Sequence, residues 1–283
     1  MDRTRPWTDY PLVAFDTETS GAFAVGSEIV EFGAVKWFQG QIIDRLQILI
    51  KPTRPMGEEV IKIHGITNEM VADCPPMKDV IGSIHQFMDG SIGLAHHAPF
   101  DMGFIAYDFE KYGLPLFTTP VFCSSLLSRK YIHGTENHKL QTLVKHFGID
   151  GGSAHRAADD AQACLYVGLK VLEKIGENAS IQTVLQAQEK KLEWLYYSLK
   201  FPQSLALQTV VKALEQQANL NILYEKGSKS KQMRPVRPLG IVRNPDGDYL
   251  SAICLLDLQK KRFYLQHLSE AEVVAVSTGS SAP

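Results

Sequence analysis

The residues of this chain that could do chemistry are carboxylates in three short clusters. Asp16 and Glu18 lie two apart in AFDTET, at the end of an apolar run. The period-two alternation of a strand would aim both carboxylates from the same face. Two neighbouring anions repel each other, so such a pair is favourable mainly when both carboxylates bind a cation. Taken alone, the pair is explained equally well by a solvated strand end, so the other clusters decide.

A third carboxylate, Asp101, follows the apolar run Ile92 to Ala95 within LAHHAPFDMGFI. Strand-to-helix junctions of this kind commonly gather ligands, although Asp101 alone would more often be a helix N-cap. Asp160 lies at the start of a long helical pattern, and His155 precedes it by five residues. Because five residues on a helix turn through about 140°, both reach one site only if His155 lies before the helix or in its first turn. Alone, His155 would more often be a surface histidine.

These clusters resemble the three exonuclease motifs of the DEDDh, or DnaQ-like, family, which includes the proofreading ε subunit of bacterial DNA polymerase III. The matching pieces are the D-x-E of Asp16 and Glu18, the H-x-A-x-F-D that ends at Asp101, and the H-x-A-x-x-D from His155 to Asp160. Secondary resemblances in IVEFGAV, IHGIT and HKLQTLVKHFGI fall in the family order. Together they cover about residues 9 to 175.

The resemblance implies an RNase H-like fold and 3′ to 5′ hydrolysis of phosphodiesters with two Mg²⁺ or Mn²⁺ ions. Two such ions about 3.5–4 Å apart supply an attacking hydroxide and neutralise the developing charge, and carboxylate oxygens are the ligands that Mg²⁺ prefers. The resemblance gives Asp16 the bridging position, with Glu18, Asp101 and Asp160 completing the coordination. It gives His155 the role of general base. The family register favours Asp160 over the neighbouring Asp159.

The resemblance also suggests substrate contacts. It implies that the backbone of Thr17 meets the 3′-terminal nucleotide, and that His64 and Phe100 bind substrate. Local structure explains His64 equally well, and core packing explains Phe100 better. One residue departs from the family pattern, because His97 stands where the second motif usually has Asn. The hydrogen bonds of that amide are therefore lost, although no metal ligand is.

The elements that must position these residues form an α/β pattern. Three antiparallel strands are predicted first, over Leu12 to Thr17, Glu28 to Phe38 and Gln41 to Ile50, the last two joined by a hairpin at Gln39-Gly40. Strands and helices then alternate, which predicts a mixed five-stranded sheet with flanking helices. The later elements are predicted at Met77–Met88, Ile92–Ala95, Phe100–Tyr112, near Val121, Lys139–Phe147 and Ala157–Ile175. A connecting helix is predicted over Ser180 to Lys200.

After the connecting helix, a small and mainly β domain is predicted. Ser204 caps a helix, and β-like runs follow at Asn221–Tyr224, Val236–Val242, Tyr249–Leu256 and Arg262–Leu268. This part resembles a WYL domain, an Sm/SH3-like barrel, through NILYEKG, RPVRPLGIV, DYLSAICLL and RFYLQHL. Asp248 stands where the family has its tryptophan, and His267 where it has its terminal Arg. The domains are therefore expected at 1–176 (exonuclease), 177–203 (connecting helix), 204–276 (WYL-like) and 277–283 (disordered tail).

The charge is uneven along the chain. The formal net charge of −2 divides into −5 for residues 1–175 and +3 for residues 176–283. A run of eighteen residues without Asp or Glu holds Lys226, Lys229, Lys231, Arg234, Arg237 and Arg243. Such asymmetry predicts a polyanion-binding surface, although the three lysines suit a solvated loop equally well. A single strand needs phosphate countercharge and stacking rings, so the candidate residues here are Arg234, Arg237, Tyr249 and Arg262.

Composition narrows the class of protein. With 45% apolar residues the chain can bury a core, which excludes disordered and collagen-like proteins. The four cysteines form no CxxC pair, so no zinc site or disulfide framework is indicated. The first residues have no apolar leader and no run is long enough to span a membrane, so a soluble cytoplasmic protein without a membrane partner is expected.

The sequence thus predicts a metal-dependent 3′ to 5′ exonuclease acting on single-stranded DNA or RNA with a free 3′ end, DNA favoured, in repair or proofreading. The WYL-like domain would bind nucleic acid or a nucleotide-like regulatory ligand. One alternative is an exoribonuclease in RNA processing. The other is a non-catalytic regulator, and the intact motif residues argue against this second alternative only. A homodimer through the 180–200 helix is a further possibility, but burial of its aromatic residues is favoured.

Overall fold

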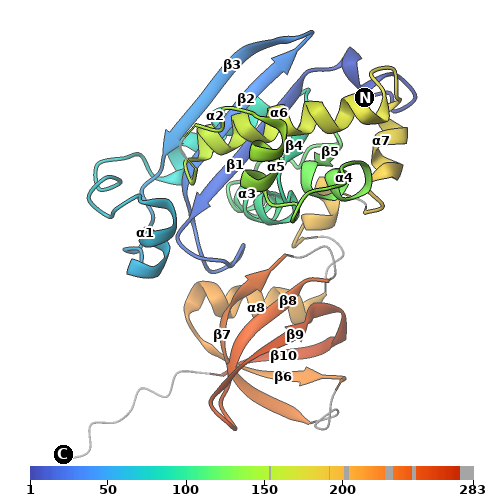
Figure 1. Cartoon of the computed structure of the whole chain (residues 1–283). Helices are drawn as coiled ribbons and strands as arrows, with labels where there is room; N and C mark the ends of the chain where they lie inside the picture. The colour runs from blue at the N-terminus through green and yellow to red at the C-terminus, as the bar shows by residue number, and fades with distance from the viewer. Residues whose placement is uncertain (153, 191, 201–203, 227–231, 244–246, 275–283) are drawn as a thin grey trace, which may run out of the picture. The chain divides into compact units, whose positions relative to one another are not determined.

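The structure is a computed structural model that describes the whole chain except residues 153, 191, 201–203, 227–231, 244–246 and 275–283. The predicted tail (277–283), Lys229 and Lys231 therefore lie outside the described residues. The chain divides into two compact units (Figure 1). The first unit comprises residues 1–21 and 28–197, and the second comprises residues 22–27 and 198–283.

The first unit is built on a five-stranded mixed sheet in the order β3-β2-β1-β4-β5. Strands β1 (Leu12–Thr19), β2 (Ile29–Phe38) and β3 (Gln41–Leu49) are antiparallel, as their alternation and hairpin predicted. Strands β4 (Ile92–Ala95) and β5 (Val121–Cys123) extend the sheet in parallel with β1. Strand β4 pairs only with Leu12–Ala14, so the part of β1 that carries Asp16 and Glu18 extends beyond the carboxyl end of β4 and is paired there with β2 alone.

Helices surround this sheet (Figure 1). Helix α6 packs against β1 and β2, and α5 packs against α6. Helices α1 and α4 were not predicted. The helices of the first unit are α1 (Glu58–His64), α2 (Met77–Met88), α3 (Pro99–Lys111), α4 (Ser124–Tyr131), α5 (Leu140–Phe147), α6 (Ala157–Ile175) and α7 (Ile181–Ala187), with 3-10 turns at η1 (Trp7–Asp9) and η2 (Trp194–Tyr197).

Glycine allows α6 to approach the sheet closely. A Cβ added at Gly33 on β2 would lie 2.1 Å from the backbone carbon of Ala157, the first residue of α6. A Cβ at Gly168 would lie 2.6 Å from Leu94 on β4. The Gly33 contact is with backbone and admits only glycine, so it fixes the start of α6 directly over β2. The Gly168 contact brings a later turn of the helix close to the Leu94 side chain.

The prediction of a connecting helix over residues 180–200 is wrong. Helix α7 ends at Ala187, and Glu189 adopts a left-handed backbone (φ +59°) that a helix cannot continue. The turn η2 then buries Trp194, which is 1% exposed, against Phe15 and Phe117 at ring distances of 6.1 and 5.5 Å. The helical spacing of apolar residues came from two separate elements, and both belong to the first unit.

The second unit contains helix α8 and a five-stranded antiparallel sheet in the order β10-β6-β7-β8-β9. Ser204 caps α8 as predicted, because its Oγ accepts a hydrogen bond from the backbone N–H of Leu207. The predicted strand Arg262–Leu268 is wrong as one element, because the turn η3 (Leu265–His267) separates β9 from β10. The elements are α8 (Leu205–Gln216), β6 (Asn219–Tyr224), β7 (Met233–Val242), β8 (Tyr249–Cys254), β9 (Gln259–Tyr264) and β10 (Leu268–Val274).

Within the described part of the chain, no helix has the length and apolar character needed to cross a membrane.

Candidate active site

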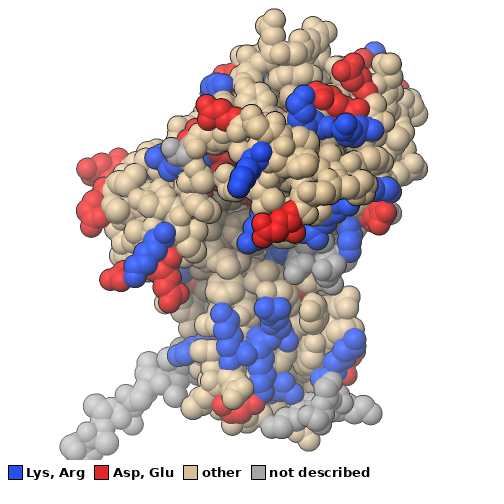
Figure 2. Space-filling model, viewed as in Figure 1, with Lys and Arg blue, Asp and Glu red and all other residues tan. Residues whose placement is uncertain are grey.

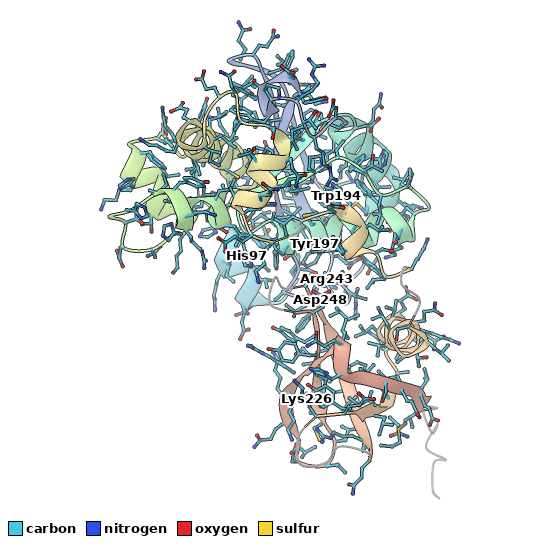
Figure 3. All side chains as sticks on the ribbon, turned by 90° about the vertical axis from the view of Figure 1, so that its right-hand side faces the viewer. His97, Trp194, Tyr197, Lys226, Arg243 and Asp248 are labelled. Atoms are coloured by element: carbon cyan, nitrogen blue, oxygen red, sulfur yellow. The ribbon has the colours of Figure 1, made fainter. Side chains whose placement is uncertain are left out.

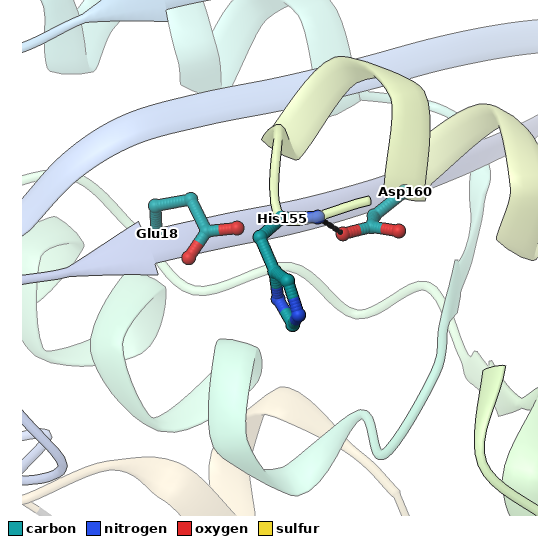
Figure 4. A group of neighbouring side chains, drawn as sticks. All are labelled: Glu18, His155 and Asp160. Carbon is teal, nitrogen blue, oxygen red and sulfur yellow. Dashed lines mark hydrogen bonds between the residues drawn. The ribbon is translucent and has the colours of Figure 1, made fainter. Parts of the chain in front are cut away.

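The third motif meets the first at the end of β1. Glu18, His155 and Asp160 each offer a ligand atom, and these atoms all lie within 4.8 Å of one another (Figure 4). Glu18 comes from β1, His155 from the turn before α6, and Asp160 from the first turn of α6. The requirement that His155 precede the helix proper is therefore met.

Asp101 joins the same site from α3. Its Oδ1 accepts hydrogen bonds from the backbone N–H and the hydroxyl of Thr17, at 3.0 and 2.8 Å. The alternative that Asp101 caps α3 is wrong, because the N-cap residue is Ala98 and no side chain caps the helix. These two bonds tie α3 to β1 between Asp16 and Glu18. They also occupy the backbone N–H of Thr17, one of the two polar groups of the backbone that the resemblance suggests for contact with the substrate.

Asp160 is held in place from two sides. The side-chain amide of Gln141 on α5 donates to its Oδ1 at 3.0 Å, and the backbone N–H of His155 donates to its Oδ2 at 2.8 Å. Asp160 is 7% exposed, and one of its carboxylate oxygens lies within 4.8 Å of the candidate ligand atoms of Glu18 and His155. His155 has a left-handed backbone (φ +63°), which turns the chain into α6 with its side chain exposed.

The electrostatics of the site favour a cation. Burial, followed by repulsion from Asp101, Asp160 and Glu18, raises the pKa of Asp16 well above its usual range. Burial and the neighbouring carboxylates raise the pKa of Glu18 to about 8, and burial raises that of Asp101 to about 7. A divalent cation would relieve this repulsion, and a donor set of carboxylate oxygens fits Mg²⁺ or Mn²⁺ better than softer metals.

A fifth carboxylate, Glu31 on β2, was missed by the sequence analysis. It is fully buried and accepts hydrogen bonds from the Arg156 guanidinium, the Gln47 amide and the backbone N–H of Ala157. Although burial raises the pKa of Glu31, these hydrogen bonds outweigh it and hold the pKa below its usual range. An acidic residue inside the apolar run IVEFGAV was the available signal, because a carboxylate there must find a partner.

His64 and Phe100, which the resemblance suggests for substrate binding, both contact neighbouring residues of the first unit. His64 ends α1 and is 5% exposed, and its Nδ1 accepts a hydrogen bond from the backbone N–H of Ile66 at 3.0 Å. The proton of the neutral ring therefore sits on Nε2. Phe100 is half-buried, with its ring 5.0 Å from that of Phe104.

His97 has a backbone explanation. It has a left-handed conformation (φ +67°) in the turn between β4 and α3, with its side chain exposed. Asn and His are both enriched in this conformation among residues other than glycine. The replacement of the usual Asn by His97 therefore preserves what the turn requires of the backbone.

The candidate residues of the second unit divide between two faces. Strand register pairs Tyr249 with Tyr264, Ser251 with Arg262 and Ile253 with Arg237, so Arg237, Tyr249 and Arg262 share one face. There the Arg262 guanidinium lies 5.1 Å from the ring centre of Tyr249. Arg234 is half-buried against Phe263, at 5.5 Å. Lys and Arg side chains gather over this unit in the view of Figure 2.

The predicted basic run is not one continuous surface. Arg243 is only 6% exposed, and its Nε lies 3.1 Å from Oδ2 of Asp248 (labelled in Figure 3). Lys226 is exposed just after β6. Asp248 therefore provides an ion-pair partner for a buried arginine.

Comparison with known protein families agrees with this geometry. Residues 13–167 match the family model described as Exonuclease, and residues 206–273 match that of the WYL domain. The DNA polymerase III PolC-type of Halalkalibacterium halodurans is 39% identical over 158 residues, which cover 56% of this chain and 11% of the polymerase. The PolC-type polymerase of Bacillus subtilis is 37% identical over 166 residues, 58% of this chain and 12% of the polymerase. The chain thus matches only about a ninth of the length of these relatives.

Solved structures show the same fold. The nuclease domain of 3′hExo, a DEDDh family member bound to rAMP, matches with a TM-score of 0.52 and 19% identity, covering 60% of this chain and 96% of that domain. Exonuclease I matches with a TM-score of 0.52 and 16% identity, covering 86% of this chain and 55% of its own. These likenesses establish the fold expected from the motifs.

Proposed function

The chain belongs to the exonuclease family, and from this premise we propose that it removes nucleotides from the 3′ end of single-stranded nucleic acid, preferring DNA to RNA. The observation that supports this most is the meeting of Glu18, His155 and Asp160 at one point, with Asp16 and Asp101 beside them. The preference for DNA is supported by the similarity to regions of DNA polymerases. A role in DNA repair or proofreading is the corresponding proposal.

The four carboxylates Asp16, Glu18, Asp101 and Asp160 would hold two Mg²⁺ or Mn²⁺ ions. When bound, such ions lower the pKa of water and neutralise charge on the phosphate and the leaving oxygen. His155 accepts a proton from the attacking water, because its ring lies beside Glu18 and Asp160 and is open to solvent. Thr17 holds Asp101 in position through its two hydrogen bonds.

The second unit would hold the nucleic acid strand or a nucleotide-like ligand. The face with Arg237, Tyr249 and Arg262 combines cations for phosphates with rings on which bases can stack. Free cysteines at Cys123, Cys164 and Cys254 are buried and suit a reducing compartment such as the cytoplasm.

The test follows 5′-labelled single-stranded DNA and RNA of the same sequence with Mg²⁺, Mn²⁺ or EDTA. A ladder that shortens from the 3′ end is expected with either metal and not with EDTA. Asp160→Asn should lower the rate about 1,000-fold, since it removes a metal ligand. Asp159→Asn is the matched control, because Asp159 is adjacent in sequence and is not a proposed metal ligand. Its rate of hydrolysis should stay within about threefold of the wild-type rate.

Two outcomes would contradict the proposal. If both polymers stayed intact with either metal, the chain would not be an active exonuclease, and a non-catalytic binding role would follow. If RNA were shortened much faster than DNA, the exoribonuclease alternative would replace the preference for DNA.

A further inference from the structure

We propose that Arg156, clamped by the buried Glu31, is a positioning residue that holds the turn carrying His155 in its active geometry. The inference rests on the proposed function, because it takes His155 as the general base. It adds two residues, neither of which is among the four proposed metal ligands. Their role is to fix the backbone of the turn from which His155 projects.

The clamp is a two-pronged ion pair on a buried carboxylate. Arg156 donates from Nη2 to Oε1 of Glu31 at 2.7 Å and from Nε to Oε2 at 3.2 Å. Glu31 is fully buried, whereas the Arg156 side chain is 34% exposed. Gln47 on β3 donates to Oε1 at 2.7 Å and restrains the carboxylate from its other side. Such a bidentate pair fixes orientation as well as distance.

The clamp acts on the backbone at the functional turn. The N–H of Ala157, the residue after Arg156, donates to Oε2 of Glu31 at 3.0 Å. The carbonyl of Arg156 accepts from the N–H of Asp160 at 2.9 Å, and the N–H of His155 donates to the Asp160 carboxylate at 2.8 Å. Consecutive residues from 155 to 157 are thus tied either to Glu31 or to Asp160.

The turn needs this support for two reasons. His155 has a left-handed backbone, which costs a residue with a side chain free energy unless its surroundings hold it there. In addition, the start of α6 rests on Gly33 of β2, two residues from Glu31, so the carboxylate and the close contact fix the same point. Loss of the clamp would free the turn while leaving every proposed metal ligand present.

A purely structural role makes a different prediction. Removing Arg156 leaves a buried unpaired carboxylate, which destabilises a protein whether or not catalysis is involved. A positioning role requires instead that the effect on turnover pass through His155. The two roles can therefore be separated by a double-mutant cycle.

The experiment measures kcat and KM on a 5′-labelled single-stranded DNA for Arg156→Gln, in the wild type and in His155→Ala. We expect kcat to fall about 100-fold in the wild type, with KM nearly unchanged, because a misplaced catalytic group slows the chemical step. In the His155→Ala background the same change should cost less than about threefold, since its target is already gone. Arg156→Lys keeps the charge without the fork and should lose about tenfold.

Arg45→Gln is the matched control. Arg45 also joins β3 to α6, through the side chain of Gln162, but the carboxylate of Glu31 is not its partner. Its kcat should stay within about twofold of the wild type, because the functional turn is not disturbed. The double variant Glu31→Gln/Arg156→Gln removes both charges together and leaves no unpaired buried carboxylate. It therefore provides a second test of the clamp if Arg156→Gln fails to fold.

Amide hydrogen exchange supplies a readout independent of turnover. Exchange at the N–H groups of His155 and Ala157 should be at least about tenfold faster in Arg156→Gln, with the amides of β2 unchanged. An inert wild type with this exchange pattern would refute the proposed function and leave the clamp standing. An equal loss of kcat in both backgrounds, or a loss that follows the melting temperature across the variants, would overturn the inference.

Discussion

At the scale of single residues, the second motif shows how a backbone requirement can be met by different side chains. His97 lies between β4 and α3 with a positive φ, and its neighbour His96 is held by the hydroxyl of Ser124 and the carbonyl of His138. The amide expected at position 97 has a short polar side chain that tolerates the left-handed conformation, and histidine shares this tolerance. The conformation of the turn is therefore the property that the residue must satisfy.

Substitutions at His97 test this explanation. His97→Asn should leave the free energy of unfolding within about 0.5 kcal/mol of the wild type, because it keeps a residue suited to positive φ. His97→Val should lower it by about 1–2 kcal/mol, because a β-branched residue is strained there. Urea unfolding measures both. If Asn proved as destabilising as Val, the imidazole itself would be what the turn needs.

The acidic residues of the site could be predicted from their spacing, but Glu31 and Arg156 could not. Asp16, Glu18, Asp101 and Asp160 each belong to a short local pattern that a sequence shows directly. Glu31 and Arg156 are 125 residues apart, and nothing local to either one indicates its partner. A buried ion pair between distant segments becomes visible only when the fold brings β2 and α6 together.

At the scale of elements, the approach of α6 to β2 determines where Asp160 and His155 lie. The contact depends on Gly33, where any Cβ would meet the backbone of Ala157 at 2.1 Å. Backbone cannot move aside as the end of a flexible side chain can, so the start of the helix would have to shift.

Gly33→Ala should therefore lower the free energy of unfolding by about 1–3 kcal/mol and also reduce the rate of hydrolysis. Gly82→Ala on α2 is the control, because nothing lies within 4 Å of the added Cβ and the site is exposed. It should raise stability by about 0.5–1 kcal/mol, as alanine does in helices. Thermal unfolding and the hydrolysis assay measure both effects. A harmless Gly33→Ala would mean that α6 has room to move away from β2.

The end of β4 should confer a pH dependence on stability. Burial lowers the pKa of His96 to about 4, so the folded protein keeps this ring neutral while the unfolded chain protonates it near its ordinary pKa of 6.5. The unfolded state then binds more protons between about pH 6.5 and 4, and the contribution of His96 to stability is lost as the pH falls through that window.

His96→Gln should flatten the fall in melting temperature between pH 6.5 and 4, because the glutamine cannot titrate. The comparison uses the difference between the variant and the wild type, so that carboxylates common to both cancel. His133→Gln is the control, because His133 is an exposed histidine in the loop after α4. An unchanged pH slope in His96→Gln would show that other groups cause the acid sensitivity.

Most elements of the sheet and its helices were predictable because their apolar patterns are regular. Helices α2 and α6 and strand β4 have the predicted bounds. The prediction of one helix over residues 180–200 failed because the spacing of apolar residues indicates which residues are buried but not whether the helix between them is continuous. The turn η2 buries its aromatic residues although no helix connects it to α7. The prediction of a single strand over Arg262–Leu268 failed because a short turn after β9 interrupts an otherwise uniform β-like run, and β10 begins after that turn.

At the scale of the whole molecule, the charge asymmetry along the sequence is reduced by pairing. Arg243 is buried with Asp248, and Arg234 packs on Phe263, so fewer cations are open than the composition suggested. Arg237 and Arg262 are exposed on the same face of the second unit. Lys260, paired with Ile253, is exposed on this face as well. If the face holds a strand, the two arginines should supply part of its phosphate contacts.

The double variant Arg237→Ala/Arg262→Ala should therefore bind single-stranded DNA with a weaker salt dependence. The slope of log K against log salt is negative, and each lost phosphate contact reduces its magnitude by about 0.7. The double variant should therefore reduce the magnitude of the slope by about 1.4. Fluorescence anisotropy in EDTA measures binding without hydrolysis. Arg3→Ala/Arg5→Ala, in which both arginines are paired with carboxylates of the first unit, should leave the slope unchanged. An unchanged slope in the first variant would place the strand elsewhere.

The distribution of tryptophan along the chain has a spectroscopic consequence. The chain has 3 tryptophans, and all of them lie in the first unit: Trp7 and Trp37 stack with ring centres 6.0 Å apart, and Trp194 lies beside Phe15. Tryptophan fluorescence therefore reports on the first unit alone, and the second unit contributes only tyrosine emission. Phe15 directly precedes Asp16, so the emission of Trp194 is an intrinsic probe of the strand that carries the first motif.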